Sequence, residues 1–291
     1  MDKYLSSFRE MVSLRGLTDH TIASYSTYIS AYLQYLSDNG PTAPEDASWQ
    51  QMRDFIFWVQ NTRNLSDRTI NACISQLRFF TLYVLHKPWD PYQLPFRKFD
   101  SYTPFIPSRE EMKTFLFSIS DIKFKAIRCL MFSSGLRVGE VRHLKCSDIE
   151  HSRKRIHIRA SKNRSDRYVP LSDNVWELIL RYWYSFPAGS RPKDWLFPQK
   201  KKPDRPIDHQ SIPSFILAHE KELGWEHRFT CHTFRHAFAT YHYEDGTDLL
   251  TLKALMGHRS VSSTVIYVHL ASNALMASSN PFDRMAGGFY E

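Results

Sequence analysis

The hydrophobic pattern of residues 1–87 is typical of α-helices. In residues 17–36 the apolar side chains recur every three or four positions and so share one helix face; they are Ile22, Tyr25, Ile29, Tyr32, Leu33 and Leu36. The same spacing returns in residues 65–85, and shorter helices are expected over 2–14 and 49–59. Thr18 and Ser66 stand where N-caps would begin two of these helices. About four such helices predict a small bundle with an aromatic core.

Residues 88–107 interrupt this pattern with five prolines. Proline lacks the backbone N–H and blocks helix continuation, so an extended linker is expected here. Ser108 followed by Glu111 then forms a capping box, which predicts that a second domain starts at residue 108.

The pattern after residue 108 is mixed. Residues 121–144 predict two helices with a break near Ser134 and Gly135, and later helices are expected over 173–185, 209–222, 232–243, 248–255 and 261–270. Between them, "RKRIHIRA", "SKNRSD" and "RYVPL" predict a basic strand–turn–strand unit. The expected fold is mainly α, with an N-terminal helical bundle and a C-terminal α+β domain that holds a small β-sheet or hairpin.

Composition excludes several classes of protein. No run approaches the roughly 18 apolar residues of a membrane span, and the N-terminus does not resemble a signal peptide. The four cysteines are far apart and form no CxxC pair, which indicates reduced thiols in place of a disulfide framework or a zinc site. We therefore expect a protein of the cytoplasm, associated with the nucleoid, with no membrane partner.

The net charge of +8 is unevenly distributed. Residues 1–100 hold ten basic and ten acidic residues, so the excess belongs to the rest of the chain. Nine basic and three acidic residues lie between Arg142 and Arg167. Such a run is usually a solvated surface, but it is also typical of a protein that binds a phosphate backbone. Arg153, Lys154 and Arg164 are the candidate DNA contacts within it.

The stretch "CHTFRHAFATYHYEDG" carries His232, Arg235 and His236 within five positions. His232 and His236 share a helix face and would suit zinc, but the motif is not HExxH, and an arginine beside a metal cation is unfavourable. A purely structural role is the second interpretation. The third is an anion site, because a guanidinium binds phosphate in a planar fork and a histidine adds a donor.

Other segments supply groups that would complete a phosphate site. Arg137 follows a glycine at the expected start of a helix, where anions are favoured. Lys162 lies at the tip of the basic hairpin, and His258 precedes Tyr267 by nine residues.

These four segments, in this order, resemble the tyrosine recombinase (phage integrase) family. "SGLRVGE" matches the family's first arginine motif with Arg137 and Glu140, and "SKNRSDRYVPL" matches its lysine hairpin with Lys162. "HTFRHAFAT" matches the HxxR pair, and "LMGHRSVSSTVIYVH" matches the segment that ends in the nucleophile. The hairpin departs from the family pattern at Ser161 and Asn163, which stand where glycines are usual, and Met256 is inserted before Gly257.

The resemblance implies a domain division and a set of catalytic residues. Residues 1–87 would be a SAM-like core-binding domain, 88–107 the linker, 108–271 the catalytic domain, and 272–291 a tail that docks on a neighbouring subunit. The catalytic set would be Arg137, Lys162, His232, Arg235, His258 and Tyr267. Glu140 would orient an arginine without touching phosphate. Tyr267 would attack DNA, with His232 as proton acceptor and Lys162 as proton donor, and no cofactor or metal would be needed.

The partner implied by the resemblance is double-stranded DNA with paired recombination sites. The chain would act as a homotetramer on DNA through a Holliday junction, and would be a monomer or weak dimer when free. A type IB topoisomerase-like enzyme and an inactive DNA-binding regulator are the alternatives. Integration, excision, transposition and chromosome resolution all remain open, although a core-binding region at the start of the chain favours a simple recombinase or insertion-element enzyme.

Overall fold

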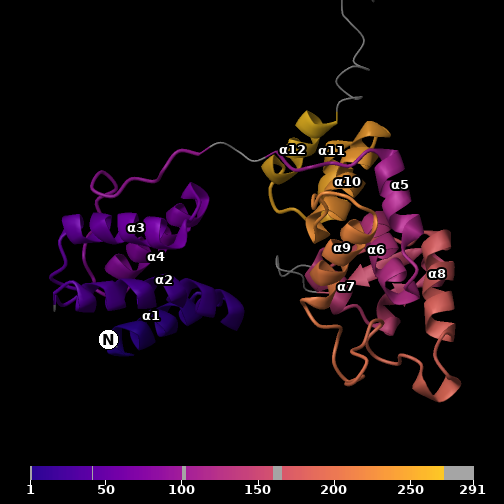
Figure 1. Ribbon diagram of the computed structural model, residues 1–291, viewed down its shortest axis with the longest axis horizontal. Coiled ribbons are helices and arrows are strands. Elements are labelled where there is room, and N and C mark those ends of the chain that lie inside the picture. The colour runs from indigo at the N-terminus through magenta and orange to yellow at the C-terminus, as the bar shows by residue number, and fades with distance from the viewer. Residues whose placement is uncertain (1, 41, 100–102, 160–165, 272–291) are drawn as a thin grey trace, which may run out of the picture. The chain divides into compact units, whose positions relative to one another are not determined.

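The computed structural model describes residues 2–40, 42–99, 103–159 and 166–271. The chain divides into two compact units, Met1–Tyr102 and Thr103–Glu291. Figure 1 shows the helices of each unit and the small sheet of the second. The expected mainly α fold with a C-terminal α+β domain is confirmed.

The first unit is a four-helix bundle of α1 (Asp2–Leu14), α2 (Asp19–Asp38), α3 (Trp49–Arg63) and α4 (Asp67–Tyr83). Its core is rich in aromatic rings, and Phe8, Tyr32, Phe55 and Phe80 are fully buried. The caps predicted at residues 18 and 66 are confirmed, because each hydroxyl accepts a hydrogen bond from the backbone three residues later. Each capping bond satisfies an amide that the helix itself leaves unpaired.

The segment expected to be an extended linker packs in part on this bundle. Leu94 is buried in the bundle core. The Arg97 amide donates to Asn71 Oδ1 at 2.8 Å, and the Arg97 Nη1 donates to Asp67 Oδ1 at 2.8 Å. The segment is non-helical, as its prolines predict, but the division between the units falls only after residue 102.

The second unit surrounds a three-stranded antiparallel sheet with helices. The sheet has the order β1 (Ile149–Glu150), β2 (Arg155–Ile158), β3 (Arg167–Pro170), and Ile158 pairs with Arg167. The predicted basic hairpin is therefore confirmed as β2–β3, while β1 was not expected. Lys162 and Arg164, which the sequence predicts at or near the hairpin tip, lie outside the described residues. The helices are α5 (Arg109–Ser118), α6 (Ile122–Ser134), α7 (Val138–Arg142), α8 (Asp173–Tyr184), α9 (Ser211–Glu222), α10 (Cys231–Glu244), α11 (Leu249–Met256) and α12 (Ser262–Leu270).

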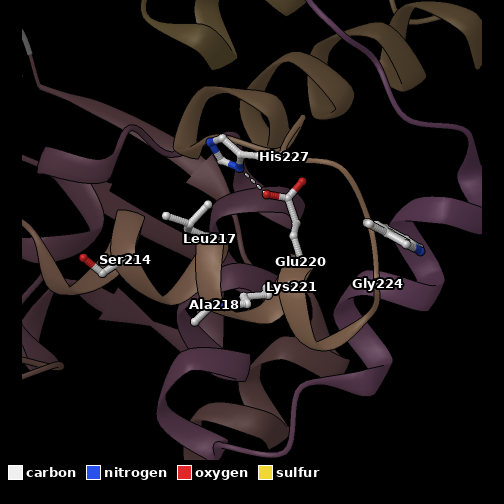
Figure 2. Close-up of a pocket in the computed structure, with 8 residues that line it drawn as sticks. Ser214, Leu217, Ala218, Glu220, Lys221, Gly224 and His227 are labelled. Carbon is white, nitrogen blue, oxygen red and sulfur yellow. Dashed lines mark hydrogen bonds and ion pairs between the residues drawn. The ribbon is translucent and has the colours of Figure 1, made fainter.

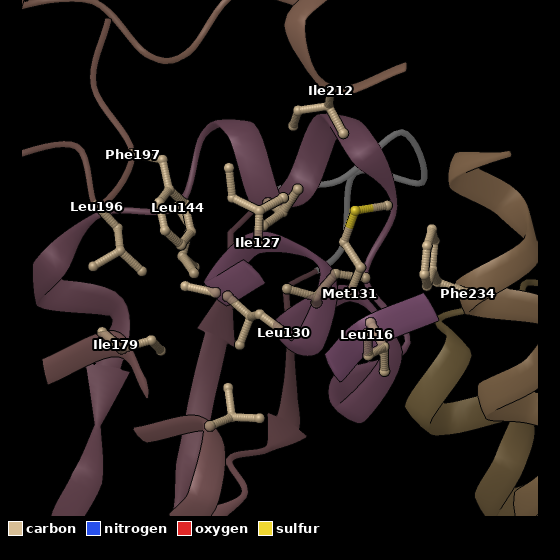
Figure 3. Packing of buried hydrophobic residues seen from close by; sticks show 14 of the residues in the cluster. Leu116, Ile127, Leu130, Met131, Leu144, Ile179, Leu196, Phe197, Ile212 and Phe234 are labelled. Carbon is tan, nitrogen blue, oxygen red and sulfur yellow. The ribbon is translucent and has the colours of Figure 1, made fainter. Parts of the chain in front are cut away.

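Helix α6 lies within the hydrophobic core of this unit (Figure 3). Its Ile127, Leu130 and Met131 are fully buried among side chains from several other elements. The helix ends at Gly135, which has a φ of 61°. A Cβ there would lie 2.6 Å from the Phe238 ring, so glycine is needed both for the left-handed turn and for the close packing of α10. The capping box of Ser108 and Glu111 at the start of α5 is confirmed.

Candidate active site

Helix α10 carries Arg235 into the interior, with 3% of its surface exposed. Its Nη1 donates to the Gly135 carbonyl at 2.5 Å, and its Nη2 donates to the Met256 carbonyl. Both carbonyls lie at helix C-termini, where the helix dipole favours a cation. Burial, and after it the nearby positive charge of Arg137, lowers the Arg235 pKa to about 9. The guanidinium is thus held rigidly in a position where an anion would stabilise it.

Glu140 connects Arg137 with a second arginine, Arg167. Its carboxylate accepts from the Arg137 amide at 2.9 Å and from Arg137 Nη1 at 2.8 Å. It also accepts from Arg167 Nη1 at 2.8 Å and Nη2 at 2.9 Å, while Arg167 Nε donates to the Leu255 carbonyl. Burial alone would raise the Glu140 pKa, but the hydrogen bond and charge of Arg167, with those of Arg137, lower it to about 2. The carboxylate is therefore ionised and fixes two guanidinium groups, one from the N-cap of α7 and one from β3.

Tyr267, on α12, is 2% exposed and lies within the electrostatic influence of Arg235 and Arg137. Its hydroxyl is 3.1 Å from Nδ1 of His236 on α10. Burial raises the Tyr267 pKa, against the opposing effect of Arg235 and Arg137. The tyrosine is therefore protonated near neutral pH, and it must lose its proton before it can act as a nucleophile.

The ring of His258 also lies close to the Tyr267 ring. Gly257 ends α11 in a left-handed conformation with a φ of 61°, and His258 follows directly. The two rings are nearly parallel, with an interplanar angle of 11° and centroids 6.3 Å apart. Nδ1 of His258 is 2.9 Å from the Thr264 hydroxyl. Burial, and then the charge of Arg235, lowers the His258 pKa to about 4, so the ring is neutral at pH 7.

His232 is exposed in the first turn of α10, with its ring centroid 6.1 Å from that of His236. The structure therefore brings together five of the six catalytic candidates, Arg137, His232, Arg235, His258 and Tyr267, together with Glu140. Lys162 lies outside the described residues. Among the described residues no three His, Cys, Asp or Glu side chains gather as a metal-binding group.

The candidate DNA contacts Arg153 and Lys154 lie on the exposed turn between β1 and β2. Their side chains are 68% and 67% exposed. Arg153 is 3.6 Å from Glu150, and Lys154 Nζ is 2.6 Å from Asp173. Arg164 falls in the segment without described structure. Both described side chains are accessible to a ligand. Binding a ligand would break their ion pairs with Glu150 and Asp173, but such exposed pairs contribute little to stability.

Sequence reasoning missed two residues of this cluster. Arg167 was part of the basic hairpin, but nothing local distinguished it from its basic neighbours. The sequence suggested only a metal-binding role for His236. The available signal was its spacing of four residues from His232, which places both histidines on the same helix face. The contact with Tyr267 depends on how α10 packs against α12.

A separate pocket of about 600 Å³ lies on α9 and the loop after it (Figure 2). Leu217, Ala218 and Trp225 line it, with Glu220 hydrogen-bonded to His227. It shares no residue with the Tyr267 cluster.

None of the helices in the described part of the chain is long and apolar enough to cross a membrane.

Comparison with known proteins places this geometry in a family. Residues 109–274 match the phage integrase family, and residues 4–91 match the phage integrase N-terminal SAM-like domain. A protein of Sinorhizobium fredii named as an integrase/recombinase, y4qK, is 31% identical over 94% of this chain and 86% of its own length. Tyrosine recombinase XerD of Oceanobacillus iheyensis is 29% identical, over 90% of this chain and 91% of its own.

Solved structures share the fold. The Tn1549 transposon integrase, in complex with transposon right end DNA, superposes with a TM-score of 0.72 at 14% identity, covering 98% of this chain and 99% of the other. The chain belongs to the phage integrase family, the tyrosine recombinases. It is a site-specific DNA recombinase of the tyrosine type.

Proposed function

We propose that this chain cuts and rejoins DNA through a covalent bond between Tyr267 and a 3′-phosphate. The observation that carries the proposal is the position of the Tyr267 hydroxyl, next to His236 and within the electrostatic field of Arg235 and Arg137. A tyrosine with only a packing role gains nothing from nearby cations. A tyrosine that attacks a phosphodiester needs them.

Arg137, Arg235 and His258 are the proposed phosphate ligands. A phosphodiester repels nucleophiles by its negative charge, and the pentavalent transition state concentrates that charge on the non-bridging oxygens. Fixed donors aimed at developing charge are usually the largest single catalytic contribution. Arg235 is anchored by two carbonyls and Arg137 by Glu140, so neither group needs to reorganise when DNA binds.

Proton transfer completes the proposed chemistry. Tyr267 must lose a proton as it attacks, and the departing 5′-oxygen must gain one. Lys162 is the proposed donor to the 5′-oxygen, and its motif assigns it to the hairpin that leads into β3. The family motif assigns the acceptor role to His232. Since the phosphotyrosyl bond conserves the energy of the broken strand, rejoining requires neither ATP nor a metal.

The proposed biological substrate is a pair of DNA sites on which four copies exchange strands through a Holliday junction. Relatives named as recombinases and solved integrase–DNA complexes of the same fold support a DNA partner. The excess positive charge of the catalytic unit would provide most phosphate contacts. Residues 272–291 would dock on a neighbouring copy. The reaction would take place in the cytoplasm and would serve a mobile element or chromosome resolution.

Covalent trapping tests this proposal. Wild-type protein would select sites from a library of random duplexes, and each site would then be nicked just 3′ of the scissile phosphate so that the short fragment diffuses away. We expect the wild type to become attached and Tyr267→Phe to bind equally well without attachment. Tyr241→Phe is the matched control, because it removes another buried hydroxyl, one that donates to the Pro107 carbonyl at 2.7 Å. Attachment of Tyr267→Phe, or no attachment by any variant, would refute the proposal.

A further inference from the structure

The hydrogen-bond partner of the Tyr267 hydroxyl is His236. Nδ1 of His236 lies 3.1 Å from that oxygen, within the reach expected of a general base. The two ring centroids are 5.8 Å apart, and the tyrosine is almost fully buried. His232, one turn earlier on α10, is exposed, with its ring 6.1 Å from that of His236. Position thus favours His236 over His232 as the group in contact with the nucleophile.

The protonation states suit a transfer from oxygen to nitrogen. Burial lowers the His236 pKa to about 4, with added effects of His232 and Arg235 from its own helix. At pH 7 the imidazole is therefore neutral and retains one nitrogen lone pair. Burial raises the Tyr267 pKa, so the hydroxyl carries its proton. A neutral ring with its hydrogen on Nε2 accepts from this hydroxyl through Nδ1.

The charges around His236 link this transfer to DNA. Arg235 and His232 on α10 face it, His258 approaches from the loop after α11, and Tyr267 approaches from α12. The positive charge of Arg235 opposes an imidazolium while no anion is bound. A phosphate held by Arg235 would offset that charge and raise the pKa of His236. A proton acceptor at this position would therefore become effective only once the substrate is bound, while Tyr267 stays protonated in the free protein.

We propose that His236, rather than His232, is the catalytic residue that accepts the Tyr267 proton. This inference rests on the proposed function, in which Tyr267 is the nucleophile. The Tyr267 O–H bond breaks as the oxygen–phosphorus bond forms, and the proton moves to Nδ1 of His236. The bond between phosphorus and the 5′-oxygen breaks, and Lys162 protonates that oxygen. Rejoining reverses each transfer, so the protons balance over a full cycle.

The test uses the full chain and the nicked duplexes selected by the wild type. His236→Ala removes the acceptor, and His236→Asn keeps a hydrogen-bond acceptor that cannot take up a proton at neutral pH. His232→Asn is the matched control on the same helix face. The rate of covalent attachment would be measured for each, with ordinary tyrosine at position 267 and with a fluorinated tyrosine whose hydroxyl is more acidic. Melting and DNA binding would confirm that each variant is folded.

We expect both His236 variants to attach about 10²–10⁴-fold more slowly than wild type, with unchanged DNA binding. The fluorinated tyrosine should recover much of that loss, because a more acidic nucleophile needs less help from a base. A bridging sulfur at the 5′-position should not recover it, since it relieves only the leaving group. His232→Asn should show no recovery with the fluorinated tyrosine.

Three results would overturn the assignment. Restoration of the rate by His236→Asn would reduce His236 to a positioning residue. A loss that the fluorinated tyrosine leaves unchanged would mean that His236 only packs against Tyr267. Recovery in the His232 variant would return the role to His232. If the wild type attaches through another residue, Tyr267 is not the nucleophile and the proposed function fails first, a result visible by peptide mapping.

Discussion

Replacing Glu140 with glutamine should destabilise the catalytic unit, because this carboxylate holds two guanidinium groups that are only 21% and 9% exposed. Its side chain is 6% exposed and accepts hydrogen bonds from Arg137 and Arg167 at 2.8–2.9 Å. A glutamine would keep the shape but would direct an NH₂ group at other donors. It would also leave Arg167, which is 9% exposed, without its counter-charge. Removing one partner of a buried ion pair typically costs about 3–5 kcal/mol.

The pKa of Glu140 gives an independent magnitude. It falls from a usual value of 4.5 to about 2, and each unit corresponds to about 1.4 kcal/mol, so ionisation of Glu140 contributes about 3 kcal/mol to folding. Because the pKa is lowered in the folded state, this contribution is fully present above about pH 4.5 and is lost as pH falls towards 2. We therefore expect Glu140→Gln to lose about 3 kcal/mol at pH 7, and the gap to shrink by about 1 kcal/mol between pH 6 and pH 3.5.

Urea unfolding of the full chain at both pH values measures this gap. Glu150→Gln is the matched control, because Glu150 pairs with Arg155 at 2.8 Å in a more exposed position, and that change should alter stability little. A Glu140→Gln protein within about 0.5 kcal/mol of wild type at pH 7 would refute the reasoning. A large gap that does not change with pH would show that packing, and not charge, makes Glu140 important.

Three further outcomes follow from the proposed chemistry. Lys162→Ala should slow cleavage, measured by covalent attachment, about 10²–10⁴-fold. A substrate with sulfur in place of the bridging 5′-oxygen should recover most of that rate, and no recovery would mean that Lys162 does not donate the proton. Cleavage should continue in excess EDTA, because arginines and histidines supply the positive charge, and a loss reversed by magnesium or zinc would contradict this expectation. The logarithm of DNA affinity should fall linearly with the logarithm of salt concentration, with a slope that becomes shallower by about 0.9 when Lys154 is replaced by glutamine; an unchanged slope would remove Lys154 from the DNA contacts.

The sequence by itself determined the helices, their starting points and the family. Apolar residues at helical spacing place the four helices of the first unit, and Ser66 and Ser108 mark helix starts because a cap is a contact within one turn of chain. The motifs around Arg137, Arg235, His258 and Tyr267 were readable for the same reason. Each motif is a short contiguous run of residues, so its spacing can be recognised without knowledge of the fold.

Only the tertiary structure decided which of these residues touch. His232 and His236 are four residues apart and share a helix face, so their spacing cannot tell which one meets Tyr267; that depends on the packing of α10 against α12. Arg167 is one of nine basic residues in its segment, and its role depends on Glu140, 27 positions earlier, and on the carbonyl of Leu255, 88 positions later. Local sequence encodes local hydrogen bonds, whereas contacts between distant segments depend on the packing of the whole core.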